Sequence, residues 1–156
     1  MNIERRNVLK LGTALAVALT AGVIKPQQAW AAQEKWNEEA FEATDIEGVI
    51  EALGGSGSGE ESDKISLQAP DIAENGAVVP VAVASELENT TEISILVPEN
   101  PNALTAQFTI PEGTLPEVAT RIKMGGTSDI YALVKADGNY YLAHKEVKVT
   151  LGGCGG

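Results

Sequence analysis

A single cysteine is the side chain best suited to covalent chemistry, and Cys154 stands third from the C-terminus. Glycine flanks it on both sides, at Gly152, Gly153, Gly155 and Gly156. Glycine has no side chain to pack and does not favour one backbone conformation, so we expect a narrow, flexible arm. Three extended residues would carry the thiol roughly 10 Å beyond the folded part of the chain. Such an arm is suited to delivering a thiol into the pocket of another protein.

The sequence around Cys154 offers the thiol no activating charge. The nearest fixed charge is the C-terminal carboxylate, and no Lys or Arg lies beside the cysteine. A thiol in such surroundings is mostly protonated at neutral pH, so we expect partner proteins to activate it. A redox enzyme would need a resolving cysteine or a local base, and the chain has only one cysteine. The pattern therefore predicts a carrier and not an enzyme, with no catalytic residue of its own.

The other polar residues show no catalytic pattern. His144 is the only histidine, and one His with one Cys matches no recognised metal-ligand spacing. The carboxylates lie in a predicted helix, a linker and turns, where acidic residues usually cap a helix or keep the segment in contact with water. The glycines around Ser56 fit neither a nucleophile elbow nor a dinucleotide-binding fingerprint. We expect neither a metal nor a cofactor.

Residues 1–31 have the features of an export signal. Arg5 and Arg6 precede an apolar run at 11–24, and the small residues Ala29 and Ala31 have the spacing that suits cleavage by a signal peptidase. The run is shorter than the roughly 20 residues that span a bilayer as a helix. The paired arginines resemble the twin-arginine signal, which exports folded proteins. We predict a periplasmic protein without membrane insertion.

The remaining chain is acidic and begins with a helical pattern. Removing the predicted signal leaves seven basic and 21 acidic side chains, a formal charge of −14 that argues against a nucleic-acid partner. Apolar residues recur every three or four positions from 36 to 53, with a break near Thr44, and a Gly/Ser-rich run follows. We expect these parts: a twin-arginine-type signal at 1–31, a helical segment and linker at 32–63, a β-sandwich at 64–151, and the carrier arm at 152–156.

Beyond Lys64, short β-branched runs alternate with Pro, Asn and Gly, which is typical of a β-sandwich. Aromatic residues make up only 4% of the chain, so we expect an aliphatic core. Asp137 and Gly138 tolerate positive φ and predict a hairpin. Pro80 cannot donate a hydrogen bond, which predicts an edge or a bulge for its strand. About seven strands are predicted, at 65–68, 78–85, 91–97, 104–110, 118–124, 130–135 and 140–151.

The chain resembles the SoxY family, the sulfur-carrier subunits of the bacterial thiosulfate-oxidising Sox system. The resemblance covers the twin-arginine signal, the segment Pro-Asp-Ile-Ala-Glu-Asn-Gly-Ala-Val-Val-Pro-Val at 70–81 and, most specifically, the terminal Gly-Gly-Cys-Gly-Gly. It implies an immunoglobulin-like sandwich in a SoxYZ heterodimer with a β partner, SoxZ, that lacks its own signal. It also implies that a c-type cytochrome complex loads thiosulfate onto Cys154 and that a sulfate thiohydrolase later releases sulfate.

A second class of function remains open. A periplasmic or surface adhesion module could use the same sandwich for binding, with an incidental or dimerising cysteine at its end. The tail distinguishes the two, because an adhesion module should tolerate the loss of Cys154.

Overall fold

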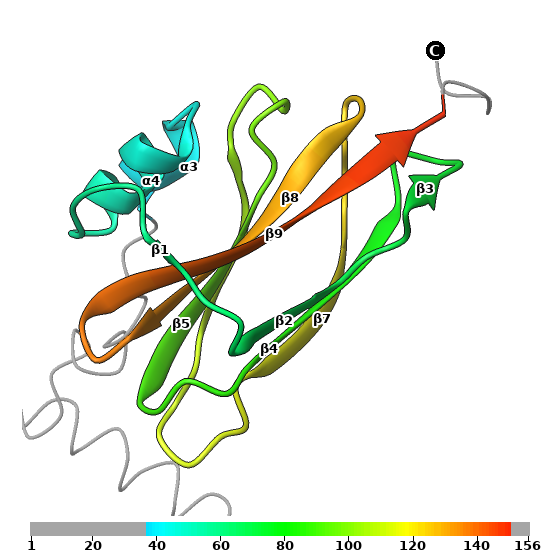
Figure 1. Ribbon diagram of the computed structural model, residues 1–156. Helices are drawn as coiled ribbons and strands as arrows, with labels where there is room; N and C mark the ends of the chain where they lie inside the picture. Colours follow the sequence, from blue (N-terminus) through cyan, green and yellow to red (C-terminus); the bar gives the residue numbers. More distant parts are fainter. Residues whose placement is uncertain (1–36, 151–156) are drawn as a thin grey trace, which may run out of the picture. The chain divides into compact units, whose positions relative to one another are not determined.

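A computed structural model describes residues 37–150, which form two β-sheets packed face to face (Figure 1). The larger sheet has the order β1-β9-β8-β5-β6, with β3 also paired to β9, and the smaller sheet has the order β2-β4-β7. The predicted immunoglobulin-like β-sandwich is confirmed. The bounds are α3 Glu38–Glu42, α4 Ile46–Ala52, β1 Glu60–Glu61, β2 Ile65–Gln68, β3 Ile72–Ala73, β4 Val79–Ser85, β5 Thr90–Leu96, β6 Leu104–Thr109, β7 Glu117–Ile122, β8 Ser128–Ala136 and β9 Asn139–Val149.

All seven predicted strands are present, and their ends differ from the predicted ends by no more than one or two residues. Two further strands, β1 and β3, were not predicted, and each adds two residues in parallel to β9. A two-residue strand has no alternation that a sequence pattern could reveal. The boundaries expected for the export signal and the arm fall outside residues 37–150 and stay predictions.

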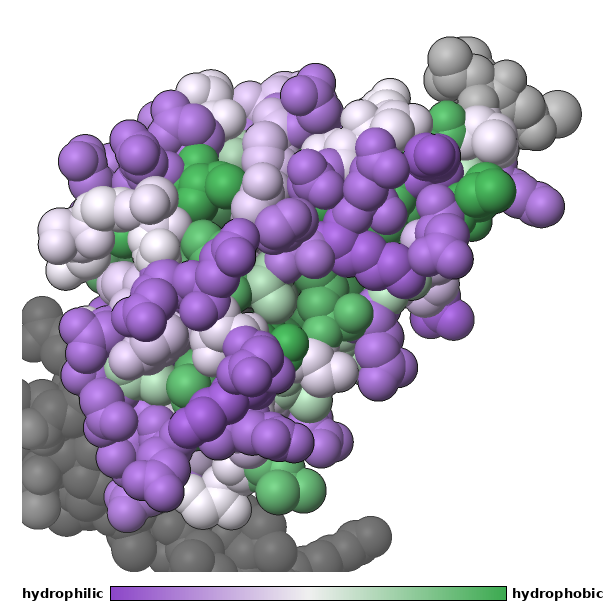
Figure 2. All heavy atoms as spheres, in the orientation of Figure 1, coloured by the Kyte–Doolittle hydropathy of each residue, from purple (hydrophilic) through white to green (hydrophobic). Residues whose placement is uncertain are grey.

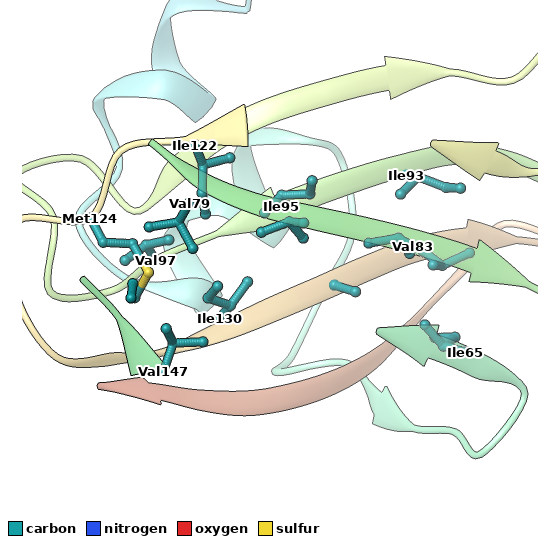
Figure 3. Close-up of a cluster of buried hydrophobic side chains, with 14 of the residues drawn as sticks. Ile65, Val79, Val83, Ile93, Ile95, Val97, Ile122, Met124, Ile130 and Val147 are labelled. Atoms are coloured by element: carbon teal, nitrogen blue, oxygen red, sulfur yellow. The ribbon is translucent and has the colours of Figure 1, made fainter. Parts of the chain in front are cut away.

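The space between the sheets is filled by aliphatic side chains and one methionine, as the low aromatic content predicted. Ile93 and Ile95 of β5 and Ile130 of β8 are completely buried there, together with Val79 and Val83 of β4 (Figure 3). Branched side chains on a pleated surface pack closely and lose little rotamer freedom. This aliphatic core fixes the two sheets against each other, and the rings of Phe108 and Tyr141 pack against it while only partly buried.

The helices begin where side chains cap them. Asn37 Oδ1 accepts the Ala40 amide at 3.2 Å before α3, and Asp45 Oδ1 accepts the Gly48 amide at 2.7 Å before α4. The predicted break near Thr44 is confirmed, although Asp45 is the residue that caps. Within residues 37–150, no helix is long and apolar enough to cross a membrane.

The helices pack on the larger sheet. Val49 and Ile50 of α4 are fully buried in one cluster with Leu133 and Tyr140, and the Tyr140 hydroxyl donates to the Leu53 carbonyl at 2.9 Å. The start of the predicted linker is also packed, since a Cβ on Gly55 would come within 2.5 Å of the Tyr140 ring. This face of the larger sheet is therefore partly covered by the protein's own helices.

The predicted hairpin is confirmed at the turn between β8 and β9. Asp137 and Gly138 have φ values of 50° and 79°, and Ala136 pairs with Asn139 across them. A two-residue turn with positive φ at both central residues has a backbone twist that matches the twist of the two strands it joins.

The prediction for Pro80 needs a correction. Its strand, β4, lies in the middle of the smaller sheet and is not an edge strand. On the β2 side, however, the last pair is Gln68 with Ala82, so β2 does not reach as far as Pro80. Pro80 has a paired residue only on the other side, Arg121 of β7. The missing N–H of Pro80 therefore interrupts no ladder.

Candidate functional site

The predicted carrier arm, residues 152–156, begins shortly after the end of β9 in the sequence, and the structure describes the chain up to Thr150. The residues predicted to carry function lie outside residues 37–150: Cys154, Gly152, Gly153, Gly155 and Gly156 of the arm, and Arg5 and Arg6 of the export signal. The described base consists of the end of β9 and Thr150, with the segments that bind them. Its geometry determines where an arm can start.

The segment around β3 binds one side of the arm base. Lys148 donates its amide to the Asp71 carbonyl at 3.0 Å, and Thr150 donates its amide to the Ala73 carbonyl at 3.1 Å. The Thr150 hydroxyl reaches the same carbonyl at 3.5 Å. These bonds continue the parallel pairing of β3 with β9, so the backbone is held up to Thr150.

The loop before β8 binds the other side. The Val149 amide donates to Thr127 Oγ1 at 3.0 Å, just beyond the last β8 pair, Ser128 with Val147. Successive amides of the arm base therefore bond in opposite directions, as backbone groups do in the middle of a sheet. A strand end bonded on both sides frays less than one bonded on a single side.

Gly76 brings three segments together at this base. A Cβ at this position would lie 2.5 Å from the Met124 carbonyl oxygen and 2.9 Å from Val149 Cγ1. Met124 in turn donates its amide to the Gly76 carbonyl at 2.7 Å. Asn75 shapes the turn, because its Oδ1 accepts the Ala77 amide at 3.0 Å. In the sequence this segment carries a family resemblance but no signal of its role in holding the arm base.

A lysine ties the preceding loop to β9. Lys145 Nζ donates to the Ala69 carbonyl at 2.5 Å and lies 2.9 Å from Asp71 Oδ1. The ion pair is largely exposed and contributes little alone. The backbone contact nevertheless places the loop that leads into β3 against the arm strand.

Two apolar side chains are exposed near the arm base. Ile72 of β3 is 57% exposed and Val78, just before β4, is 49% exposed. Figure 2 shows hydrophobic surface over β3, beside the end of β9. A partner that receives the arm would pass close to this surface.

A separate hollow of about 540 Å³ lies beside the start of α4. Three carboxylates, those of Asp45, Glu47 and Glu61, line it together with Tyr131 and His144. His144 is half exposed, with its Nδ1 3.6 Å from Glu61 Oε1 and its ring 5.4 Å from the Tyr131 ring. No local pattern in the sequence indicates this hollow, because its lining residues come from five separate segments of the chain.

Two kinds of active-site chemistry, a tyrosine base and a metal centre, find no support in this hollow. Burial raises the pKa of Tyr131, and the charges of Asp129 and Glu61 raise it further, so the phenol stays protonated and is no base at neutral pH. Among residues 37–150, no group of three His, Cys, Asp or Glu side chains could hold a metal ion. The anchored base of the arm is therefore the better candidate for function.

Comparison with known proteins gives matches to one family and to solved structures. The model of the family described as sulfur oxidation protein SoxY matches residues 50–154. The sulfur carrier protein SoxY from Chlorobium limicola f thiosulfatophilum is 43% identical, with a TM-score of 0.55, over 59% of this chain and 84% of that chain. A superoxide reductase, neelaredoxin from Ignicoccus hospitalis, is 18% identical, with a TM-score of 0.49, over 56% and 80% of the two chains. No curated protein matches.

The family match spans two thirds of the chain and includes the segments that anchor the end of β9. The likeness to the reductase is too weak to support a functional argument. The fold, the family match and the identity to a solved carrier agree, and we conclude that this chain is a member of the SoxY family of sulfur carrier proteins.

Proposed function

We propose that this chain binds thiosulfate-derived intermediates covalently on Cys154 and presents them to partner enzymes of sulfur oxidation. Family membership supports a carrier role, and the glycine-flanked cysteine supplies a thiol on a narrow arm. The observation that supports the proposal most is the anchoring of β9 up to Thr150, four residues before the cysteine.

An anchored base limits where the thiol can go. Four extended residues span roughly 14 Å, so the cysteine would stay within that distance of Thr150 while the glycines allow many directions. A partner would have to bring its active site close to the arm base. The carrier would then need only to release the arm into a cleft and withdraw it.

The chemistry would be divided between the carrier and its partners. Loading joins the outer sulfur of thiosulfate to Cys154 Sγ, releases the thiol proton and passes an electron pair to a c-type cytochrome complex. A sulfate thiohydrolase then adds water across the terminal bond, releases sulfate and leaves the remaining sulfur on the cysteine. The chain itself would act as a covalent scaffold and not as an enzyme, because its thiol has no neighbouring base or cation in the sequence.

The proposed assembly is a heterodimer with a SoxZ-like β partner in the periplasm. Twin-arginine export carries folded proteins, so a partner without a signal could cross the membrane already bound to this chain. A stable interface of this kind buries at least about 1,000 Å² in total. Purification of the chain from its native cell as a monomer that gains no thermal stability from such a partner would contradict the assembly.

Replacing the cysteine tests the carrier function. Cys154→Ser should abolish thiosulfate oxidation in the reconstituted system while changing the free energy of unfolding by less than about 0.5 kcal/mol. Changing Gly153 and Gly155 to Pro is the matched variant, because it keeps the thiol but stiffens the arm. That variant should still react with a thiol reagent yet load slowly. Full thiosulfate oxidation by Cys154→Ser would instead favour a binding module with an incidental cysteine.

A further inference from the structure

The strand β7 has one edge without a partner in the described part of the chain. It pairs with β4 on one side and ends the order β2-β4-β7 on the other. We propose that two copies of this chain pair antiparallel along this edge, in a register centred on Ala119. The proposal goes beyond the carrier function and does not depend on it.

The backbone of β7 directs hydrogen-bonding groups toward this edge. Ser85 donates its amide to the Pro116 carbonyl at 3.0 Å, which makes these two residues a hydrogen-bonded pair. Such pairs alternate along an antiparallel ladder, so Glu117, Ala119 and Arg121 turn their backbone groups away from β4. Pro80 faces Arg121 in the register, and a residue without an N–H fits that non-bonded position.

The side chains of these three residues are exposed and complementary to themselves. When Ala119 faces Ala119 of a second copy, Arg121 faces Glu117 of that copy, and the reverse pair forms as well. Opposite charges placed directly across antiparallel strands attract. Within residues 37–150, neither Glu117 nor Arg121 forms an ion pair. Each charge would therefore gain a partner without losing one that the structure describes.

The backbone can complete the pairing at the centre. The two Ala119 residues would exchange both of their hydrogen bonds, as a bonded antiparallel pair does. The Glu117 amide already donates to the Leu115 carbonyl at 2.9 Å. The carbonyl of Glu117 remains to accept the Arg121 amide of the second copy. The two smaller sheets would then form one continuous sheet.

The edge lacks the features that usually prevent such pairing. Natural edge strands are protected by prolines, bulges or repeated like charges, whereas β7 contains no proline, pairs with β4 without a register shift and has charges of both signs. Leu115 is 75% exposed just before the strand and would face Lys123 of the second copy, where the aliphatic stem could cover it. At the centre of the edge the exposed side chain is that of Ala119, which is too small to hinder the approach of a second copy.

Charge reversal tests the register. Sedimentation equilibrium would compare chains of residues 32–156 that all carry Cys154→Ser, which prevents disulfide dimers. Glu117→Arg and Arg121→Glu should each weaken self-association by about tenfold, because both pairs become repulsive. An equal mixture of the two variants should recover it, because each edge then faces the opposite charge. The double variant Glu117→Arg with Arg121→Glu should also recover it.

A proline variant separates edge pairing from other contacts. Ala119→Pro removes the central amide without removing a hydrogen bond to β4, so it should abolish self-association while thermal unfolding stays close to that of the matched Ala119→Ser variant. An unmodified chain that stays monomeric at all concentrations, reversals without effect, or a dimer that persists in Ala119→Pro would each overturn the proposal.

Discussion

Gly76 lies where the turn before β4, the loop after β7 and the end of β9 meet. It donates no side chain to the core, yet it sets how closely these three segments approach, because a Cβ would overlap the Met124 carbonyl oxygen. The Met124 amide bonds back to the Gly76 carbonyl, so the contact cannot simply open. The position of the arm base therefore depends on a residue far from Cys154 in the sequence.

We expect Gly76→Ala to lower the free energy of unfolding by about 1–3 kcal/mol, since overpacking forces the backbone to shift. Urea unfolding followed by circular dichroism would measure the change. Gly126→Ala is the control, because a Cβ there meets no atom within 4 Å. Equal stabilities of the two variants would show that the close packing at Gly76 is not a constraint.

The helices show how far local patterns predict an element. The apolar spacing predicted the helical segment and its break near Thr44, because both depend on neighbouring residues. The capping-box spacing of Thr44 and Glu47 indicated Thr44 as the capping residue, but the neighbouring Asp45 side chain can also accept an amide. In the structure Asp45 accepts the Gly48 amide at 2.7 Å.

Replacing the cap tests this assignment. Asp45→Ala should lower the free energy of unfolding by about 1 kcal/mol, the usual effect of removing an N-cap. Thr44→Ala should change it by less than about 0.5 kcal/mol. Thermal or urea unfolding would compare the stabilities of the two variants. A larger loss of stability in Thr44→Ala than in Asp45→Ala would show that Asp45 is not the capping residue.

The anchoring of β9 lies beyond what local patterns predict. Alternation and turn residues predicted the seven longer strands and the hairpin, because those signals are local. The bonds from Thr150 to Ala73 and from Val149 to Thr127 join residues that are far apart in the sequence. β3, with only two residues, has no signal of its own. The sequence predicted the site as a cysteine on an arm, whereas the structure describes the arm's base.

For the whole molecule, export through the twin-arginine route is the first prediction. The double substitution of Arg5 and Arg6 by Lys should strand the precursor in the cytoplasm, because the twin-arginine route requires the paired arginines. Cell fractionation and immunoblotting would measure this. Replacing Lys10 by Arg keeps the charge and serves as the control. Normal periplasmic accumulation of the double variant would remove the argument for folded export.

A sulfur carrier of this kind must hold its substrate on Cys154. Mass spectrometry of the C-terminal peptide, after incubation of the carrier with thiosulfate and its native oxidising complex, detects such an adduct. We expect a thiosulfate-derived adduct on Cys154 that a reductant removes and that a thiohydrolase shortens by releasing sulfate. An unmodified Cys154 under conditions in which thiosulfate is consumed would contradict the carrier function.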